Sequence, residues 1–231
     1  MSGDFVNTII EMYGEESDVF RVRVAGEFPK ALPDSFIPME WAERQSEAAR
    51  LDDLPNIRID IGVDVARFGD DSSVIAPVRD KRQQDEPSIY HHNDTMQIAG
   101  HTIATVKRYA AIDTVREIHV KIDCDGLGAG VYDRLIEQRE EMQTAINERR
   151  RKEADEGGAD DVPLLFEVYE CHFGGEGGTV SPTDPVEYAN STGVMWGTIR
   201  EALRHSTLVL WRDEQQITQL SNRRYSINSA G

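Results

Sequence analysis

The chain has 231 residues, of which 39% are hydrophobic. This is enough to form one substantial core, so disorder over the whole chain is excluded. No apolar run reaches about eighteen residues, and the first residues lack a basic stretch followed by an apolar one. We therefore expect a soluble, intracellular protein without a membrane span. The two cysteines, Cys124 and Cys171, cannot build a disulfide framework or a zinc site and are expected to be core thiols.

The charge is strongly negative: 42 acidic residues against 25 basic ones leave a net charge of −17. Taken alone, this argues against a nucleic-acid partner, because phosphate binding depends on Lys and Arg. The acids are rich in Asp and the bases are poor in Lys. Such a bias is typical of adaptation to high salt, but a merely acidic surface explains it equally well.

The first half of the chain predicts an appendage followed by an antiparallel meander. The appendage contains an alternating strand within 18–29, a helix over 39–50 that Pro38 opens, and a linker at 51–56. Apolar residues then recur at period two through IRIDIGVDV, the clearest strand in the sequence. Further strands over 72–78 and 88–92, joined by a turn and by a polar loop over 81–87, complete the meander.

The second half alternates helices with strands. In chain order we expect a helix over 95–112, a strand over 117–123, a helix over 131–154, a strand over 164–170, a Gly-rich surface or substrate-contacting loop over 171–185, a helix over 194–205, a strand over 207–211 and a short helix over 213–220. Right-handed crossovers place the later strands parallel to the first strand. The predicted fold class is α/β, with a mixed sheet and helices on both faces.

Two acids stand at the carboxyl ends of strands predicted to be parallel neighbours, Asp64 and Asp123. Ligands gather at such ends, and adjacent strands lie about 4.8 Å apart, so the two carboxylates are expected to share one pocket. A divalent cation relieves their repulsion, and oxygen ligands suit Mg²⁺ or Mn²⁺ in a two-metal site that hydrolyses a phosphodiester. Asp125 points to the same side and could bind metal directly or through water, and Arg67 is placed to meet a phosphate. The alternative is that these acids only occupy solvated turns.

Other motifs are less informative. GLGAG after Asp125 imitates a dinucleotide-binding turn, but Asp123 and Asp125 would repel a pyrophosphate, so its glycines are expected to pack the following helix against the sheet. The six histidines show no metal-ligand spacing and are expected to be structural or solvated. The basic run 149–152 is either the solvated end of a helix or a DNA contact.

Several segments together resemble the large terminase subunits of tailed viruses, specifically their C-terminal nuclease domain with a ribonuclease H-like fold. GVDVARFGDDSSVI resembles the family's first catalytic strand and turn, which implies that Asp64 is the first catalytic acid and Asp71 a later acid of the turn. VKIDCDGLGAGVYDRL resembles the second acidic strand, which implies that Asp123 is catalytic and Asp125 auxiliary. YGEESDVFRVRVAGEFP, EYANSTGVMWGTIREAL and DEQQITQLSNRRYSINSAG resemble other parts of the same family.

The sequence departs from the family in two respects. It contains no ATPase domain with a phosphate-binding loop, so residues 1–54 are expected to be a connecting segment and residues 55–231 the nuclease domain. It also ends within the segment that precedes the family's third acid, and Asp184, Glu187 and Asp213 do not match that position. The fragment is therefore expected to bind metal weakly and to cut poorly or not at all.

The resemblance implies a Mg²⁺- or Mn²⁺-dependent endonuclease domain that cuts concatemeric viral DNA during packaging. The implied partners are double-stranded DNA, the portal protein and the small terminase subunit, and the implied location is the host cytoplasm. Two alternatives remain open: a non-catalytic docking or DNA-binding module of the packaging motor, and a cellular resolvase-like nuclease on the same fold.

Overall fold

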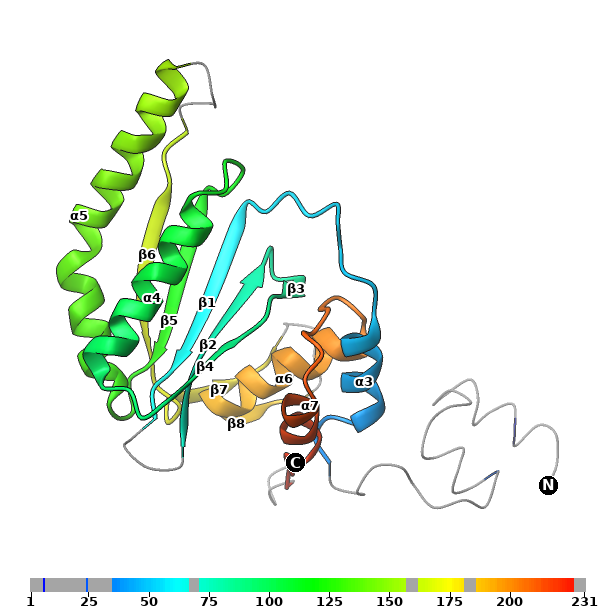
Figure 1. Ribbon diagram of the computed structural model, residues 1–231. Helices are drawn as coiled ribbons and strands as arrows, with labels where there is room; N and C mark the ends of the chain where they lie inside the picture. The colour runs from blue at the N-terminus through cyan, green and yellow to red at the C-terminus, as the bar shows by residue number, and fades with distance from the viewer. Residues whose placement is uncertain are drawn as a thin grey trace. The chain divides into compact units, whose positions relative to one another are not determined.

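The computed structural model describes Val6, Val24 and residues 35–66, 71–156, 162–180 and 186–226. Within the chain, two compact units are distinguished: Met1–Ala48 together with Arg212–Gly231, and Ala49–Trp211. The second unit contains the sheet shown in Figure 1. Of the strand predicted within 18–29, only Val24 belongs to the described residues, so that prediction lies outside them. In the described part of the chain, no helix is long and apolar enough to cross a membrane.

The first unit pairs two helices that lie far apart in the sequence. Helix α3 spans Met39–Glu47, and helix α7 spans Glu214–Ser221 and packs against it. The Asp213 side chain caps α7 by accepting a hydrogen bond from the backbone N–H of Gln216. An edge contact between the rings of Phe36 and Tyr225, at 6.0 Å, joins the segments that flank the two helices.

The second unit begins with the predicted antiparallel meander. Strand β1 spans Arg58–Asp64 and pairs with β2, Ser72–Arg79, which pairs in turn with β4, Ser88–His91. The loop predicted between β2 and β4 also contains a two-residue strand, β3, Gln83–Gln84, on the same edge of β2. Ile57, predicted as the first strand residue, lies outside β1 and is 46% exposed.

Two helical crossovers add the parallel strands. Helix α4 (Thr95–Ala110) leads to β5 (Glu117–Asp123), and helix α5 (Gly128–Asp155) leads to β6 (Leu165–Cys171). Strand β5 runs parallel to β1, and β6 runs parallel to β5, which gives the order β3-β2-β1-β5-β6 with β4 on the outer side of β2. The mixed α/β sheet predicted from the sequence is thus confirmed.

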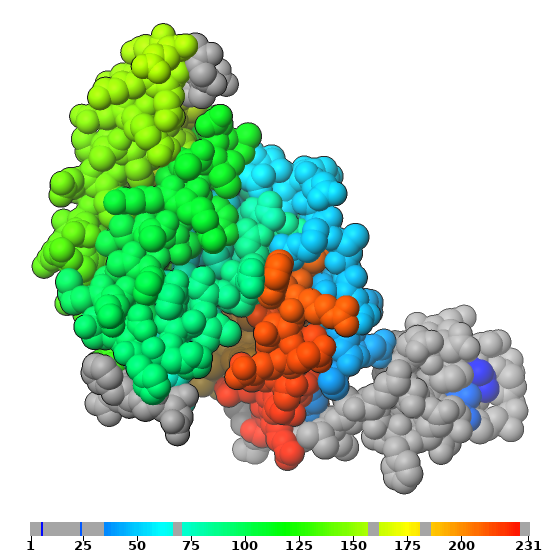
Figure 2. Space-filling model, viewed as in Figure 1, coloured from blue at the N-terminus to red at the C-terminus, as the bar shows by residue number. Residues whose placement is uncertain are grey.

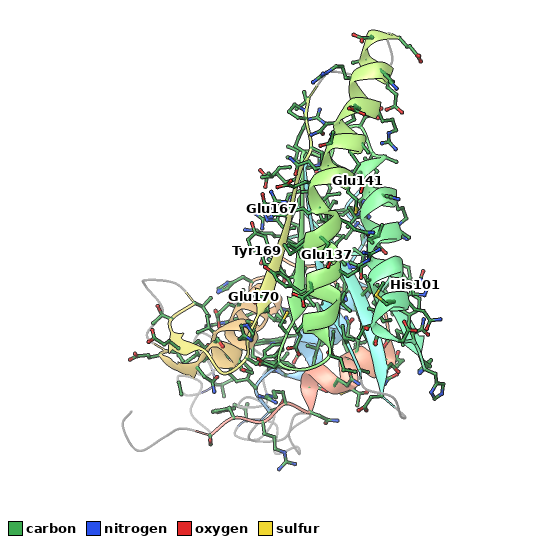
Figure 3. All side chains as sticks on the ribbon, turned by 90° about the vertical axis from the view of Figure 1, so that its left-hand side faces the viewer. His101, Glu137, Glu141, Glu167, Tyr169 and Glu170 are labelled. Carbon is green, nitrogen blue, oxygen red and sulfur yellow. The ribbon has the colours of Figure 1, made fainter. Side chains whose placement is uncertain are left out.

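The two faces of the sheet differ in chemistry. Alternate residues of β1 and β5, among them Ile59, Ile61, Ile118 and Val120, are fully buried, and this apolar face packs against α4 and α5. The other face carries polar side chains at the intervening positions. Helix α6, Ser191–Arg204, lies on that other side, so helices flank both sides of the sheet (Figures 1 and 3).

The Gly-rich stretch forms part of a small ribbon next to α6. Strands β7, Glu176–Gly178, and β8, Tyr188–Asn190, pair antiparallel, and Asn190 caps α6. A Cβ atom at Gly197 in α6 would lie 2.4 Å from the end of the Tyr188 ring, so any larger residue there would force this ring to move away from the helix.

The strand predicted over 207–211 does not form. Only Val209 makes a bridge, parallel to Gln83, because β3 is too short to pair with more of the segment. The segment is nevertheless anchored by backbone bonds, from Gln84 N–H to the Val209 carbonyl at 2.9 Å and from Val209 N–H to the Arg82 carbonyl at 2.8 Å. A continuous strand would need a longer partner edge.

Candidate metal centre

The carboxyl ends of β1 and β5 bring Asp64 and Asp123 to the same edge and face of the sheet. The parallel register pairs Val63 with Ile122, so the next residues of the two strands, Asp64 and Asp123, lie level with each other. Both belong to the polar face, since Val63 and Ile122 point into the core. Asp64 is exposed and Asp123 is half-buried. This is the juxtaposition that the sequence predicted.

The pKa of the Asp64 carboxyl is raised above its usual value. The causes are the partial loss of water around the group, then repulsion from the carboxylates of Asp123 and Asp71, while a hydrogen bond from the Val65 backbone acts in the opposite direction. Because Asp64 remains exposed, the repulsion is the cause that bears on ion binding. Asp123 and Asp71 therefore both lie close enough to repel Asp64, and hard oxygen donors of this kind fit Mg²⁺ or Mn²⁺.

Asp125 makes different contacts from those three acids. Its backbone N–H donates to Asp123 Oδ1 at 3.0 Å, while its own carboxylate turns toward the segment that follows β6. Asp125 Oδ1 lies 2.8 Å from His172 Nδ1, and Oδ2 accepts a hydrogen bond from the Phe173 N–H at 2.6 Å. The Phe173 N–H and then the His172 side chain lower the pKa of Asp125, and the bond with Asp125 raises the pKa of His172.

The segment held by Asp125 is bonded on its other side to the start of α6. Ser191 Oγ donates to the His172 carbonyl at 2.9 Å and accepts from the Gly175 N–H at 3.1 Å, and Thr192 Oγ1 donates to the Phe173 carbonyl at 2.6 Å. Asp125 therefore helps to fix the Gly-rich stretch and the beginning of α6 beside the end of β5.

The other predicted site residues are distributed as follows. Asp71 is exposed and directly precedes β2. Arg67 and Asp184 lie outside the described residues. Glu187 is exposed just before β8, and Asp213 caps α7. Within the described ranges, no group of three or more His, Cys, Asp or Glu side chains is arranged to hold one metal ion.

Of the three glycines after Asp125 that the sequence assigned to close packing, Gly128 has this role, whereas a Cβ atom at Gly126 would meet open space and one at Gly130 only ordinary contacts at 3.9 Å. A Cβ atom at Gly128 would lie 1.8 Å from the Asp123 carbonyl oxygen, so only glycine allows α5 to begin against the end of β5.

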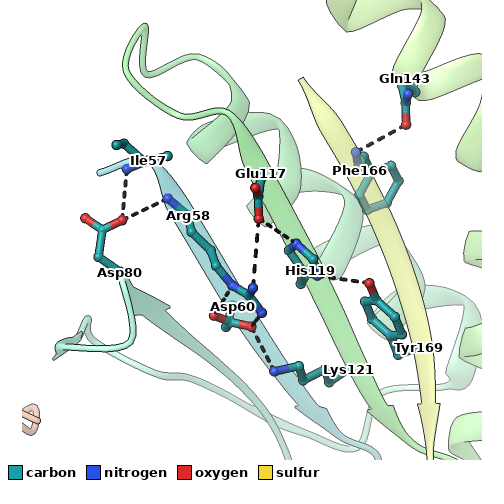
Figure 4. Close-up of polar contacts among 10 residues, drawn as sticks. All are labelled: Ile57, Arg58, Asp60, Asp80, Glu117, His119, Lys121, Gln143, Phe166 and Tyr169. Atoms are coloured by element: carbon teal, nitrogen blue, oxygen red, sulfur yellow. Dashed lines mark hydrogen bonds and ion pairs between the residues drawn. The ribbon is translucent and has the colours of Figure 1, made fainter. Parts of the chain in front are cut away.

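Sequence reasoning missed a polar network on the same face, upstream of the two acids (Figure 4). Asp60 accepts two hydrogen bonds from the Arg58 guanidinium, at 2.8 and 2.9 Å, and one from Lys121 Nζ at 2.8 Å. Burial alone would raise the pKa of Asp60, but these bonds and the two positive charges lower it to about 2. The signal was present in the sequence: an acid at the polar position of an otherwise apolar strand.

A second part of this network joins β5 to β6. The His119 ring stacks on the Tyr169 ring with centroids 5.5 Å apart, and His119 Nδ1 lies 3.1 Å from the Tyr169 hydroxyl. His119 Nε2 lies 3.1 Å from a carboxylate oxygen of Glu117. Figure 4 draws the contacts of His119 with Tyr169 and with Glu117 as dashed lines, and Figure 3 shows Tyr169 among the side chains on β6. His119 is thus a structural histidine, as expected.

The comparisons with known proteins support the fold. No family model and no curated protein matches the chain. Among solved structures, a mutant nuclease domain of the large terminase subunit gp2 of bacterial virus Sf6, with manganese and beta-thujaplicinol, has a TM-score of 0.56 at 11% identity, covering 84% of each chain. Another structure of the nuclease domain of the same subunit has a TM-score of 0.51 at 12% identity, again covering 84% of each chain.

A third structure, a mutant of the same bacteriophage Sf6 domain with calcium, has a TM-score of 0.52 at 12% identity and covers 84% of this chain and 85% of that one. At these identities the likeness concerns the fold. The chain therefore shares its fold, with the mixed sheet, with the nuclease domain of the Sf6 large terminase subunit, which agrees with the resemblance in the sequence.

Proposed function

We propose that the chain is a metal-dependent DNA endonuclease domain of a viral packaging terminase, which cuts concatemeric genomic DNA. The observation that carries this proposal is the level placement of Asp64 and Asp123 at the ends of two parallel strands, with Asp71 close enough to repel Asp64. The fold shared with nuclease domains of a terminase subunit, one of them solved with manganese, supports the same assignment.

In this proposal Asp64 and Asp123 hold Mg²⁺ or Mn²⁺ directly. Asp71 and Asp125 assist through water, which suits Asp125 because both of its carboxylate oxygens already accept hydrogen bonds from the chain. When bound, divalent ions lower the pKa of a water nucleophile and stabilise charge on the phosphate oxygens. The chain contributes two fixed carboxylates, and Asp125 holds the neighbouring segment in place.

Nicking of supercoiled plasmid in the presence of Mn²⁺ tests the activity. The 231-residue chain is expected to nick weakly, and the Asp64→Asn and Asp123→Asn variants are expected to lose all nicking, because each removes a charge that holds the ion. Asp133→Asn, an exposed acid on α5, is the matched control and should retain the activity. Equal nicking by wild type and Asp64→Asn would exclude a nuclease that uses this site.

A second candidate function is a non-catalytic docking or DNA-binding module of the packaging motor. The observation that favours it is the engagement of Asp125 with His172 and Phe173 rather than with the other acids. This function predicts that Mn²⁺ leaves the melting temperature unchanged, whereas a metal site that forms in the folded state raises it by mass action. A resolvase-like nuclease would instead cleave four-way junctions in preference to linear duplex.

In either packaging role, the portal protein and the small terminase subunit are the protein partners that we propose, with double-stranded DNA as the substrate and the host cytoplasm as the location. We likewise propose that residues 1–54 connect the nuclease domain to a motor domain. Arg67 is the proposed phosphate contact in the turn after Asp64.

A further inference from the structure

Lys121 lies beside the candidate metal centre on the polar face of the sheet. It stands two residues before Asp123 on β5, and the parallel register pairs it with Gly62 on β1. Gly62 is two residues from Asp60 and two residues from Asp64 along the same strand. A lysine at this position is therefore equally far, along β1, from the carboxylate that it contacts and from the proposed metal ligand.

Gly62 leaves a gap on this face between the two acids of β1. It is exposed, and a Cβ atom added there would meet only the Ala76 carbonyl oxygen, at 3.9 Å. The aliphatic stem of Lys121 can thus cross β1 without obstruction. Its ammonium lies 2.8 Å from Asp60 Oδ1, and the side chain is nevertheless 44% exposed. Figure 4 draws this contact as a dashed line.

The bond between Lys121 and Asp60 is the replaceable part of the network. The Arg58 guanidinium binds both oxygens of Asp60, so this carboxylate remains compensated when Lys121 leaves. A half-exposed lysine pair contributes little to stability because solvent screens it. Two residues span about 6.6 Å of a strand. The side chain of Lys121 already reaches this far back along β1 to Asp60, so it can reach equally far forward, to the level of Asp64.

We propose that Lys121 leaves Asp60 and binds a phosphate of the DNA strand adjacent to the metal centre, so that it is a substrate-binding residue. The inference rests on the proposed function, since it takes the substrate to be DNA held at Asp64 and Asp123. Lys121 would supply positive charge on the face of the acidic protein that the phosphates must approach. Asp60 then acts as a positioning residue that holds Lys121 until DNA arrives.

The test is the salt dependence of DNA binding by the 231-residue chain. A fluorescent duplex is titrated by anisotropy with Ca²⁺ present, between about 50 mM and about 300 mM KCl. Each phosphate contact contributes about 0.9 to the slope of log K against log salt. Lys121→Met should weaken binding and lower the magnitude of that slope by about 0.9, whereas Lys121→Arg should keep it.

Two further variants separate this role from a general effect of charge. Lys107→Met removes an exposed lysine of α4, the helix on the opposite, apolar face of the sheet, and should leave the slope unchanged. Asp60→Asn releases Lys121 from its competing carboxylate and should tighten DNA binding, and the double variant Asp60→Asn with Lys121→Met should lose that gain. Each variant is first checked for an intact cooperative thermal transition.

The outcomes distinguish the two proposals. Wild-type chain that binds neither Mn²⁺ by calorimetry nor duplex DNA would overturn both. If wild type binds both, and Lys121→Met has the same affinity and slope as wild type, the assignment of Lys121 fails while the proposed function stands. A loss of Mn²⁺ binding in Lys121→Met would also overturn it, because this lysine is assigned to phosphate and not to the metal.

Discussion

Asp60 and Asp64 show that two identical side chains on one strand can have opposite pKa shifts because their neighbours differ. Both lie on the polar face of β1, but Asp60 faces two cations and Asp64 faces two carboxylates. The drop in the pKa of the buried Asp60 from 3.8 to about 2 corresponds to about 2 kcal/mol of stability. This contribution is present above the unfolded-state pKa and is lost as the pH falls toward 2. The contribution of Asp64 to stability has the opposite pH dependence, because its pKa is raised.

The raised pKa of Asp64 predicts that Asp64→Asn stabilises the metal-free protein at neutral pH. A carboxyl whose folded-state pKa is raised binds more protons in the native state, so wild-type stability falls as the pH rises through the interval between the unfolded and folded pKa values. Thermal unfolding in EDTA should give the variant the higher melting temperature at pH 7, with the difference disappearing below that interval.

Addition of Mn²⁺ should reverse the order of the two proteins, because the ion stabilises wild type by mass action and lacks one ligand in the variant. An Asp64→Asn protein that gains as much melting temperature from Mn²⁺ as wild type does would rule out Asp64 as a ligand.

Among the elements, the long helix α5 shows how a basic run can serve the fold. Arg150 is buried, and its guanidinium donates to the carbonyls of Ala110, Ile112 and Val115 at 2.8 to 3.3 Å, while Arg149 also donates to Ala110. These bonds satisfy the carbonyls at the end of α4 and in the loop before β5. Burial lowers the pKa of Arg150, followed by repulsion from Arg116 and Arg149. At least these two members of the run bind backbone, so its simplest role is structural.

Replacement of Arg150 by Met is expected to lower the free energy of unfolding by about 2 kcal/mol or more. The substitution keeps much of the buried stem but removes the hydrogen bonds of a buried cation, and hydrogen bonds to charged groups contribute about 1.5–3 kcal/mol each. The loss is limited because each carbonyl keeps another donor: Arg149 for Ala110, the Val115 N–H for Ile112 and Arg116 for Val115. Urea unfolding measures the loss. Lys152→Met, an exposed neighbour on the same helix, should change stability by less than about 0.5 kcal/mol. Equal effects of the two substitutions would show that the buried bonds of Arg150 do not matter.

For the whole molecule, the net charge of −17 is the property that the site does not explain. A cation at the site would offset only the few carboxylates around it, and the remaining acids repel one another over the surface. Some negative charges on the sheet are neutralised locally, as Asp60 is by its ion pairs with Arg58 and Lys121. The overall repulsion is still long-ranged in dilute buffer, and salt reduces its range to about 3 Å at 1 M.

We therefore expect the melting temperature to rise steeply between dilute buffer and molar KCl, as adaptation to high salt would require. Differential scanning fluorimetry over a KCl series measures this, with sucrose as the control for effects that do not depend on charge. A melting temperature that is flat in KCl would indicate an acidic surface without such adaptation.

Local patterns in the sequence determined most of the elements, because period-two and helical spacing of apolar residues depend only on which face is buried. They located β1, β5, α4, α5 and the two acids at the strand ends. What only the tertiary structure decided is which polar groups meet: Asp125 with His172, Arg150 with distant carbonyls, and Lys121 with Asp60 across Gly62. Strand register and helix packing set these contacts between residues far apart in the chain, and no local spacing encodes them.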